Sequence, residues 1–193
     1  AQSKFSYYLE GRGCVFGVKF KPGGFYPFIK RPVAGLAEAP LDVAQVFGLD
    51  GPSAERSMLS QQDELRMVEL AERWIRPRLP ERDETVLLIH RMIDRIMEEQ
   101  SMTKVEQLAE GFKLSVRTVQ RLFYQYVGVT PKWVIRLYRI HNAAETIERG
   151  GTTAWSELSL QLGYHDQSHF IKDFKAVVGA TPEEYTANLF NPG

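Results

Sequence analysis

One stretch organises this chain: Asp166-Gln167-Ser168-His169-Phe170-Ile171-Lys172-Asp173-Phe174, which continues to Gly179-Ala180-Thr181-Pro182. We predict a short helix between Asp166 and Gly179, because the apolar residues recur at helical spacing and fall on one buried stripe. The stripe consists of Phe170, Phe174, Val177 and Val178. The opposite face, which is left to contact another molecule, carries Gln167, Ser168, Ile171, Lys172 and Lys175.

The same pattern occurs 51 residues earlier in the chain. Ser115 matches Asp166, and a second helix is predicted to begin there with its apolar residues at the same offsets: Val119, Phe123, Tyr126 and Val127. Its outer face carries Arg117, Gln120, Arg121 and Tyr124. Gly128-Val129-Thr130-Pro131 then repeats Gly179-Ala180-Thr181-Pro182 in register, so the chain contains one small unit twice.

A shorter apolar helix is predicted before each of these two helices, in residues 105–112 and in residues 155–162. A short helix, a tight turn and a second helix with a polar outer face describe a helix-turn-helix. The alternative is a pair of helical hairpins that only build a core. We favour the helix-turn-helix, because a core repeat gives no reason for Arg, Gln and Lys to occupy matching outward positions.

A longer helix is predicted to join the two units. Thr130 is its expected N-cap and Pro131 its first residue. Residues 131–149 would form a rod about 28 Å long at about 1.5 Å per residue. Its predicted inner face consists of Val134, Leu137, His141, Ala144 and Ile147. Successive major-groove faces on one side of B-DNA lie about 34 Å apart, so such a rod can hold two reading helices on adjacent turns of one duplex.

Several motifs occur in a fixed order: Ser115-x-Arg117-x-x-Gln120-Arg121-Leu122-Phe123, Gly128-x-Thr130-Pro131, Arg139-x-x-x-Ala143, Gly163-Tyr164-x-Asp166-Gln167-Ser168-x-Phe170, and Phe174-Lys175 through Thr181-Pro182. Together they resemble the AraC/XylS family of bacterial transcription regulators, over roughly residues 85–187. Two positions depart from the family pattern. Lys113 replaces the usual Gly of the first turn, and Ser159 replaces a small Ala. A lysine in a turn that requires positive φ is strained.

The outward side chains suit the edges of DNA bases. Arginine can donate two hydrogen bonds to guanine, glutamine can pair with adenine, and Ile171 can pack on a thymine methyl group. The resemblance points to the same base-reading positions: Arg117, Gln120, Arg121, Gln167, Ser168, Ile171 and Lys172. Helix starts and positive charge favour phosphate, so the predicted phosphate contacts are Ser115, Thr130, Lys132 and Lys175.

Composition limits the class of protein. The 193 residues carry 24 Lys and Arg against 24 Asp and Glu, so the formal net charge is zero. From Glu84 onward the balance is 12 to 13, so a DNA-binding half would need its positive charge gathered on one face. The single cysteine, Cys14, excludes a disulfide framework and favours the cytoplasm. No apolar run is long enough for a membrane helix.

Residues 1–35 have a different pattern. Phe16, Val18 and Phe20 alternate with other residues, as in a strand, and Pro22-Gly23-Gly24 follows as a turn. Because one strand cannot form a stable sheet alone, we expect a small remnant of a larger N-terminal β domain. The resemblance implies an effector-binding or oligomerising role for such a domain. The alternative is a small irregular cap packed on the helices.

The predicted fold is therefore mainly α: two helix-turn-helix subdomains joined by a long linker helix and preceded by a small α/β remnant. We expect residues 1–80 to form the N-terminal remnant with connecting helices. These include a helix ended by Gly48 and a longer one that breaks near Ser60. Residues 81–193 form the expected DNA-binding domain, with helix-turn-helix units at about 101–128 and 152–179. The Pro-containing and charged residues 76–83 are the expected linker.

No nucleophile–base pair or phosphate-binding loop indicates an enzyme or a cofactor. His169 and Asp173 lie one helical turn apart, but no third ligand follows at a suitable spacing, so no metal site is predicted and His169 is expected to be a partly buried packing residue. Two functions remain open. One is a sequence-specific regulator that binds double-stranded DNA, with RNA polymerase and a small-molecule effector as further partners. The other is a ligand-sensing or protein-interaction module of the same family that no longer binds DNA.

Overall fold

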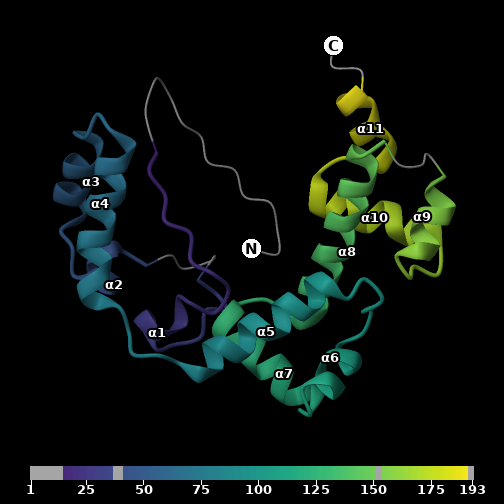
Figure 1. Cartoon of the computed structure of the whole chain (residues 1–193), viewed down its shortest axis with the longest axis horizontal. Helices are drawn as coiled ribbons and strands as arrows, with labels where there is room; N and C mark the ends of the chain where they lie inside the picture. Colours follow the sequence, from purple (N-terminus) through teal and green to yellow (C-terminus); the bar gives the residue numbers. More distant parts are fainter. Residues whose placement is uncertain (1–14, 37–40, 151–153, 191–193) are drawn as a thin grey trace. The chain divides into compact units, whose positions relative to one another are not determined.

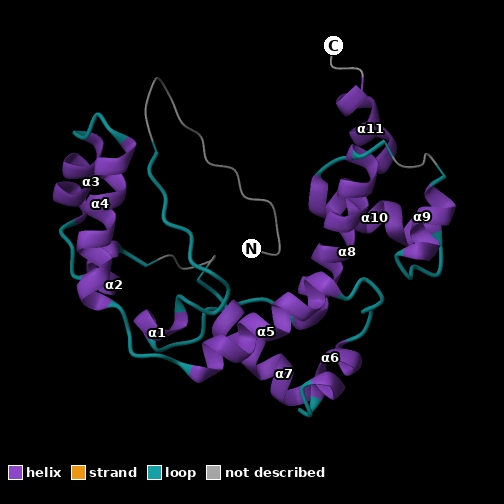
Figure 2. Cartoon of the chain, viewed as in Figure 1, coloured by secondary structure: helices purple, strands orange, loops and turns teal. Residues whose placement is uncertain are grey.

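The computed structural model describes residues 15–36, 41–150 and 154–190. Within these ranges the chain forms helices and loops and no strand (Figure 2). In chain order (Figure 1) the helices are α1 (Tyr26–Ile29), α2 (Val43–Phe47), α3 (Gly51–Leu59), α4 (Glu64–Ile75), α5 (Glu84–Glu98), α6 (Val105–Gly111), α7 (Val116–Leu122), α8 (Pro131–Glu148), α9 (Trp155–Gln161), α10 (Gln167–Val178) and α11 (Pro182–Phe190). A 3-10 turn, η1 (Arg76–Arg78), follows α4, and a π-helical turn, η2 (Phe123–Val127), follows α7.

The described residues belong to two compact units, which differ from the two helix-turn-helix units and are called the first and second compact units. The first lies within Ala1–His90 and Arg121–Val129, and the second within Arg91–Gln120 and Thr130–Gly193. None of the described helices has the length and apolar character needed to cross a membrane.

The strand predicted near Phe20 is wrong for the described residues. Residues 15–21 form an irregular extended segment that leads into a turn and then α1. An isolated strand would leave its backbone groups without a ladder partner. The aromatic side chains instead pack against one another and are half-buried. The ring of Phe20 lies 5.1 Å from Phe25, 5.4 Å from Phe28 and 6.4 Å from Phe47 of α2. This segment therefore resembles the irregular cap rather than the β remnant.

The cap also contacts η2, the turn that follows α7. The rings of Tyr26 and Tyr126 lie 4.0 Å apart, and the N–H of Val33 donates to the carbonyl of Gln125 at 2.8 Å. Tyr126 donates its hydroxyl hydrogen bond to Asp83 at 3.2 Å. These contacts hold η2, at the end of the first helix-turn-helix, against Tyr26 and Val33 of the cap and against Asp83.

The helices α2, α3 and α4 begin and end where local signals indicate. Gly48, in the left-handed conformation at φ 61°, ends α2. The predicted break near Ser60 is confirmed, since α3 stops at Leu59 and the Asp63 side chain caps α4 by accepting the N–H of Leu65 at 2.9 Å.

The core of the second unit forms where α8, α9 and α10 pack together, with α11 against α8 and α10. Phe170 and Phe174 of α10 are fully buried, as predicted, and their rings meet edge to face at 5.7 Å. The other buried members of this cluster are Ile140, Ala143, Ile147, Leu158, Leu162 and Tyr164.

The linker helix α8 begins as predicted. Thr130 accepts the N–H of Trp133 at 3.2 Å, and Pro131 occupies the first turn. The predicted inner face is partly wrong, because His141 is exposed and pairs with Glu145 at 3.4 Å. The residues that α8 buries are Pro131, Val134, Ile135, Ile140, Ala143 and Ile147. The buried stripe of α8 is thus rotated about the helix axis away from the predicted stripe, which included His141.

The two helix-turn-helix units share one turn geometry. In the first, the N–H of Lys113 donates to Glu110 and that of Leu114 to Ala109, at 3.0 and 2.9 Å. In the second, Gly163 donates to Leu160 and Tyr164 to Ser159, at 2.8 and 2.9 Å. Lys113 and Gly163 are therefore equivalent, at φ 54° and 73°. The second turn contains one more residue before the next helix, His165, which explains an offset of 51 after the turn.

This equivalence predicts opposite effects of exchanging side chains in the two turns. Lys113→Gly should stabilise the protein by about 0.5–1 kcal/mol, because glycine adopts positive φ without the steric penalty. Gly163→Ala should destabilise it by about 1–2 kcal/mol, and its Cβ would also approach Thr103 Cγ2 at 2.7 Å. Urea unfolding followed by far-UV circular dichroism measures both. Destabilisation by Lys113→Gly would show that the lysine side chain has a structural role that its φ angle does not reveal.

Candidate nucleic-acid interface

The first candidate surface lies on α7. Ser115 begins the helix by accepting the N–H of Thr118 on its hydroxyl at 3.1 Å. Val119 and Phe123 are fully buried. Because they fix the rotation of the helix about its axis, the predicted base-reading residues project into solvent. Arg117, Gln120 and Arg121 are all exposed, and none makes an ion pair or a hydrogen bond through its side chain within the described part of the chain.

The second candidate surface lies on α10. Asp166 is the N-cap, as predicted, and accepts the N–H of His169 at 2.9 Å. Ser168 and Lys172 are exposed, whereas Gln167 is half-buried. Ile171 is also half-buried and packs against the core cluster of the second unit. Only its outer part could touch a thymine methyl group, so this surface is more polar than the sequence suggested.

The predicted phosphate contacts fall into two kinds. Ser115 and Thr130 already use their hydroxyl oxygens to cap α7 and α8. Lys132, in the first turn of α8, and Lys175, in α10, are exposed and make no ion pair within the described residues. The two lysines are therefore the more available charges, while the hydroxyl groups set where each helix begins.

A partly buried polar network supports the inner side of α10. The Nε of Arg139 in α8 donates to the carbonyl of Leu162 at 2.8 Å, and its guanidinium lies 4.0 Å from the centre of the Tyr164 ring. Tyr164 donates its hydroxyl hydrogen bond to Asp173 at 3.2 Å, and Arg136 pairs with Asp173 at 3.4 Å. These contacts tie the turn and the inner side of α10 to α8.

Burial shifts the pKa of two members of the network. Burial raises the pKa of Tyr164 well above its ordinary value, so the hydroxyl remains a neutral donor. Burial also lowers the pKa of Arg139, although neighbouring Tyr164 and Asp173 oppose the shift. Sequence patterns did not single out Arg136 or Asp173 for this network. The only available signal was that Arg136 and Arg139 lie three residues apart and so share one side of α8.

The prediction that His169 is a partly buried packing residue is wrong. Its side chain is 74% exposed, and its Nδ1 lies 2.6 Å from the Oδ2 atom of Asp166. The N-cap places the carboxylate beside the ring of the third residue that follows it, and this contact holds the imidazole at the start of α10. Asp173 contacts Tyr164 and Arg136 instead of His169.

Comparison with known proteins agrees with this geometry. Residues 108–188 match the family described as a helix-turn-helix domain, and residues 1–42 match a domain of unknown function, DUF6597. An uncharacterized HTH-type transcriptional regulator of Haemophilus influenzae is 28% identical over 98 residues, which are 51% of this chain and 33% of that protein. The HTH-type transcriptional activator RhaS of Escherichia fergusonii is 28% identical over 79 residues, 41% of this chain and 28% of that protein.

Among solved structures, the C-terminal domain of AraT, a response regulator from Geobacillus stearothermophilus, is 24% identical with a TM-score of 0.47. It covers 52% of this chain and 84% of that one.

The C-terminal part of the chain is thus a helix-turn-helix domain. The relatives that this part of the chain resembles are described as HTH-type transcriptional regulators. The matched part amounts to about a third or less of the length of these curated relatives.

The cap of α10 predicts a pH dependence at this surface. The backbone N–H and ring of His169 hold the pKa of the Asp166 carboxyl below its ordinary value. A depressed pKa means that the cap stabilises the fold fully above the unfolded value, about 3.9, and is lost as pH falls through the lower folded value. Carbon-detected NMR titration of the Asp166 carboxyl group measures this shift, and amide exchange at Ser168 and His169 should accelerate below it.

The matched control is Asp166→Asn, which keeps a side-chain oxygen for the cap but cannot titrate. Its amide exchange at the start of α10 should lose this pH dependence. A carboxyl group that titrates at or above the ordinary aspartate value would contradict the assignment of Asp166 as a charged cap.

Proposed function

We propose that this chain is a transcription regulator that binds double-stranded DNA sequence-specifically, with α7 and α10 as its two reading helices. The observation that carries the proposal is the matched exposure of polar side chains on the two equivalent helices. Arg117, Gln120 and Arg121 on α7, and Ser168 and Lys172 on α10, are all exposed, whereas two apolar residues of each stripe are fully buried: Val119 and Phe123, and Phe170 and Phe174. A helix that presents such a face can enter the major groove.

The linker helix supports two segments read by one chain. α8 is a single helix of 18 residues, which corresponds to a length of about 27 Å. This length is comparable with the spacing of about 34 Å between major-groove faces on one side of the duplex. We therefore propose that one protomer reads two segments about 10 base pairs apart.

The distribution of ion pairs supports DNA binding despite the neutral balance of charge. Arg95, Arg136 and Arg149 each pair with a carboxylate. The cations on the two candidate surfaces, Arg117, Arg121, Lys132, Lys172 and Lys175, form no salt bridge within the described residues, although Lys175 lies near enough to Glu184 to lower the pKa of that carboxyl. Carboxylates thus neutralise charge away from these surfaces, which leaves positive charge where phosphate contacts are expected.

RNA polymerase and a small-molecule effector remain proposed partners. The relatives named RhaS are described as transcriptional activators, and an activator acts by way of the transcription machinery. The N-terminal residues that match DUF6597 precede the helix-turn-helix domain and are the part in which the resemblance implies a signal would be received. We also propose that the protein acts in the cytoplasm, because the relatives it resembles are transcriptional regulators.

Selection from a library of random duplexes, followed by gel shift at low and physiological salt, tests the proposal. A sequence-specific regulator should enrich an asymmetric site with two conserved segments, because the side chains of α7 and α10 differ at matched positions. Failure to enrich any sequence, together with weak binding lost at physiological salt, would favour the alternative of an interaction module without DNA-binding activity.

The two helices should contribute in different ways. Each good bidentate base contact is worth about 1–3 kcal/mol of discrimination, so Arg121→Ala should relax base preference in one segment only. Lys172→Ala should weaken binding evenly across sequences and reduce the slope of log affinity against log salt by about 1. Site selection and salt titration with each variant measure these effects.

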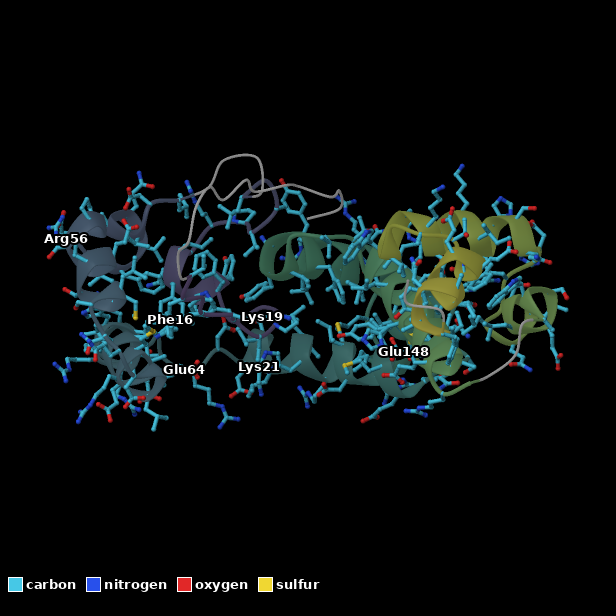
Figure 3. All side chains as sticks on the ribbon, turned by 90° about the horizontal axis from the view of Figure 1, so that it is seen from above. Phe16, Lys19, Lys21, Arg56, Glu64 and Glu148 are labelled. Carbon is cyan, nitrogen blue, oxygen red and sulfur yellow. The ribbon has the colours of Figure 1, made fainter. Side chains whose placement is uncertain are left out.

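The matched controls lie in the first compact unit, before the first helix-turn-helix unit. Arg56 and Lys21 are exposed cations outside the two candidate surfaces (Figure 3), so Arg56→Ala and Lys21→Ala should leave the selected sequence unchanged. An unchanged preference for Arg121→Ala, or a single palindromic site that requires two chains, would show that a different face meets the DNA.

A further inference from the structure

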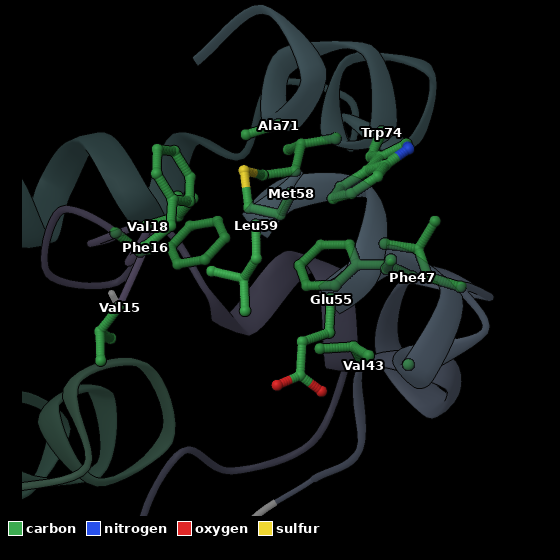
Figure 4. A pocket seen from close by; sticks show the side chains of 15 residues that line it. Val15, Phe16, Val18, Val43, Phe47, Glu55, Met58, Leu59, Ala71 and Trp74 are labelled. Atoms are coloured by element: carbon green, nitrogen blue, oxygen red, sulfur yellow. The ribbon is translucent and has the colours of Figure 1, made fainter. Parts of the chain in front are cut away.

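The first compact unit contains a cavity of about 500 Å³. Its walls come from residues 15–20 and from α2, α3 and α4 (Figure 4). The volume falls in the range of small-molecule sites, about 300–1,000 Å³. No residue of the two candidate DNA-reading surfaces lines it, so the proposed DNA contacts do not account for this cavity.

The lining is apolar and rich in aromatic rings. Phe16, Phe20, Phe47 and Trp74 contribute four aromatic side chains, and Met58 and Leu59 contribute flexible aliphatic ones. Part of this surface is open to water, since Val43 is 43% and Leu59 45% exposed. Covering such side chains with an apolar ligand removes them from water, which stabilises the complex.

Glu55 of α3 is the single ionisable side chain among the residues that line the cavity. It makes no ion pair or hydrogen bond through its side chain with the described residues. Figure 4 shows its carboxylate at the edge opposite Ala71 and Trp74. Since Glu55 is exposed, its charge stays hydrated at the mouth and adds no burial penalty to the apolar interior.

From this combination we propose that the cavity binds an amphipathic organic cation. The apolar body of the ligand packs among the aromatic rings, and its positive charge lies beside Glu55 at the mouth. Aromatic faces attract cations, and an unpaired carboxylate adds to that attraction. The same two features disfavour an anion of equal size and shape, so charge separates this ligand class from a site that only covers apolar surface.

Two probes of similar shape and opposite charge test the proposal: tetraphenylphosphonium and tetraphenylborate. Isothermal calorimetry on the full chain without DNA should show one tetraphenylphosphonium bound per chain and at least tenfold weaker binding of tetraphenylborate. Ala54→Trp fills the cavity from α3 and should weaken cation binding at least tenfold. If the tryptophan variant does not fold, as judged by circular dichroism, Ala54→Leu provides a smaller filling and a smaller loss in the same direction.

Glu55→Gln tests the charge directly. An exposed ion pair is worth little, so the cation should bind about two- to fivefold more weakly, while binding of the anion should improve. Glu64→Gln is the matched control: Glu64 lies in the first turn of α4, is exposed and does not line the cavity. It should leave both affinities unchanged.

Equal binding of both probes, binding of neither, or binding unaffected by filling at Ala54 would overturn the proposal. Sedimentation velocity tests one further case, in which two copies of the chain associate through this surface. A dimer that Ala54→Trp dissociates, with no cation bound, would show that a second copy of the chain covers this surface. Because these measurements use no DNA, their outcome is independent of the DNA-binding function.

Discussion

The burial of Phe170 and Phe174 is the constraint on which the second candidate surface depends. Both side chains are fully buried among residues of α8 and α9. A helix has one fixed period, so placing two residues one turn apart in the core determines which side chains face outward. Val119 and Phe123 act in the same way on α7. The polar faces of the two helices are thus consequences of the same packing pattern, used twice.

The turn before each reading helix adds a second constraint. It requires a left-handed residue, which is Gly163 in one unit and Lys113 in the other. In the second unit Arg139 reinforces the turn by bonding the carbonyl of Leu162 and lying over Tyr164. α8 therefore has two roles: its length sets the reach of the linker, and its arginines hold α10 in place. If α10 reads DNA as proposed, a change at the arginines of α8 would disturb that reading without any contact between these arginines and a base.

The neutral composition of the chain is compatible with the proposed function because pairing is selective. Arg136 meets Asp173 where both are partly buried, and Arg95 of α5 meets Glu99 just after the end of that helix, whereas the cations of the reading faces form no salt bridge within the described residues. Net charge sums over all groups, but a duplex meets only one face of a protein. The cavity of the first compact unit is apolar, has a single carboxylate in its lining, Glu55, and is lined by no residue of the two candidate surfaces. This fits the proposed division between DNA reading and ligand binding.

The sequence alone showed the repeat, and local patterns determined the helices α2 to α10, the caps at Thr130 and Asp166, and the positive φ of Lys113. These features depend on residues within about four positions of one another, so the local pattern contains the necessary information. Tertiary structure decided the rest. Phe20 packs on Phe28 and Phe47 instead of joining a sheet, His169 and His141 lie at the surface, and Asp173 joins Arg136 and Tyr164. Each outcome depends on partners distant in sequence or on which of two adjacent helical stripes meets the core, and periodicity carries neither kind of information.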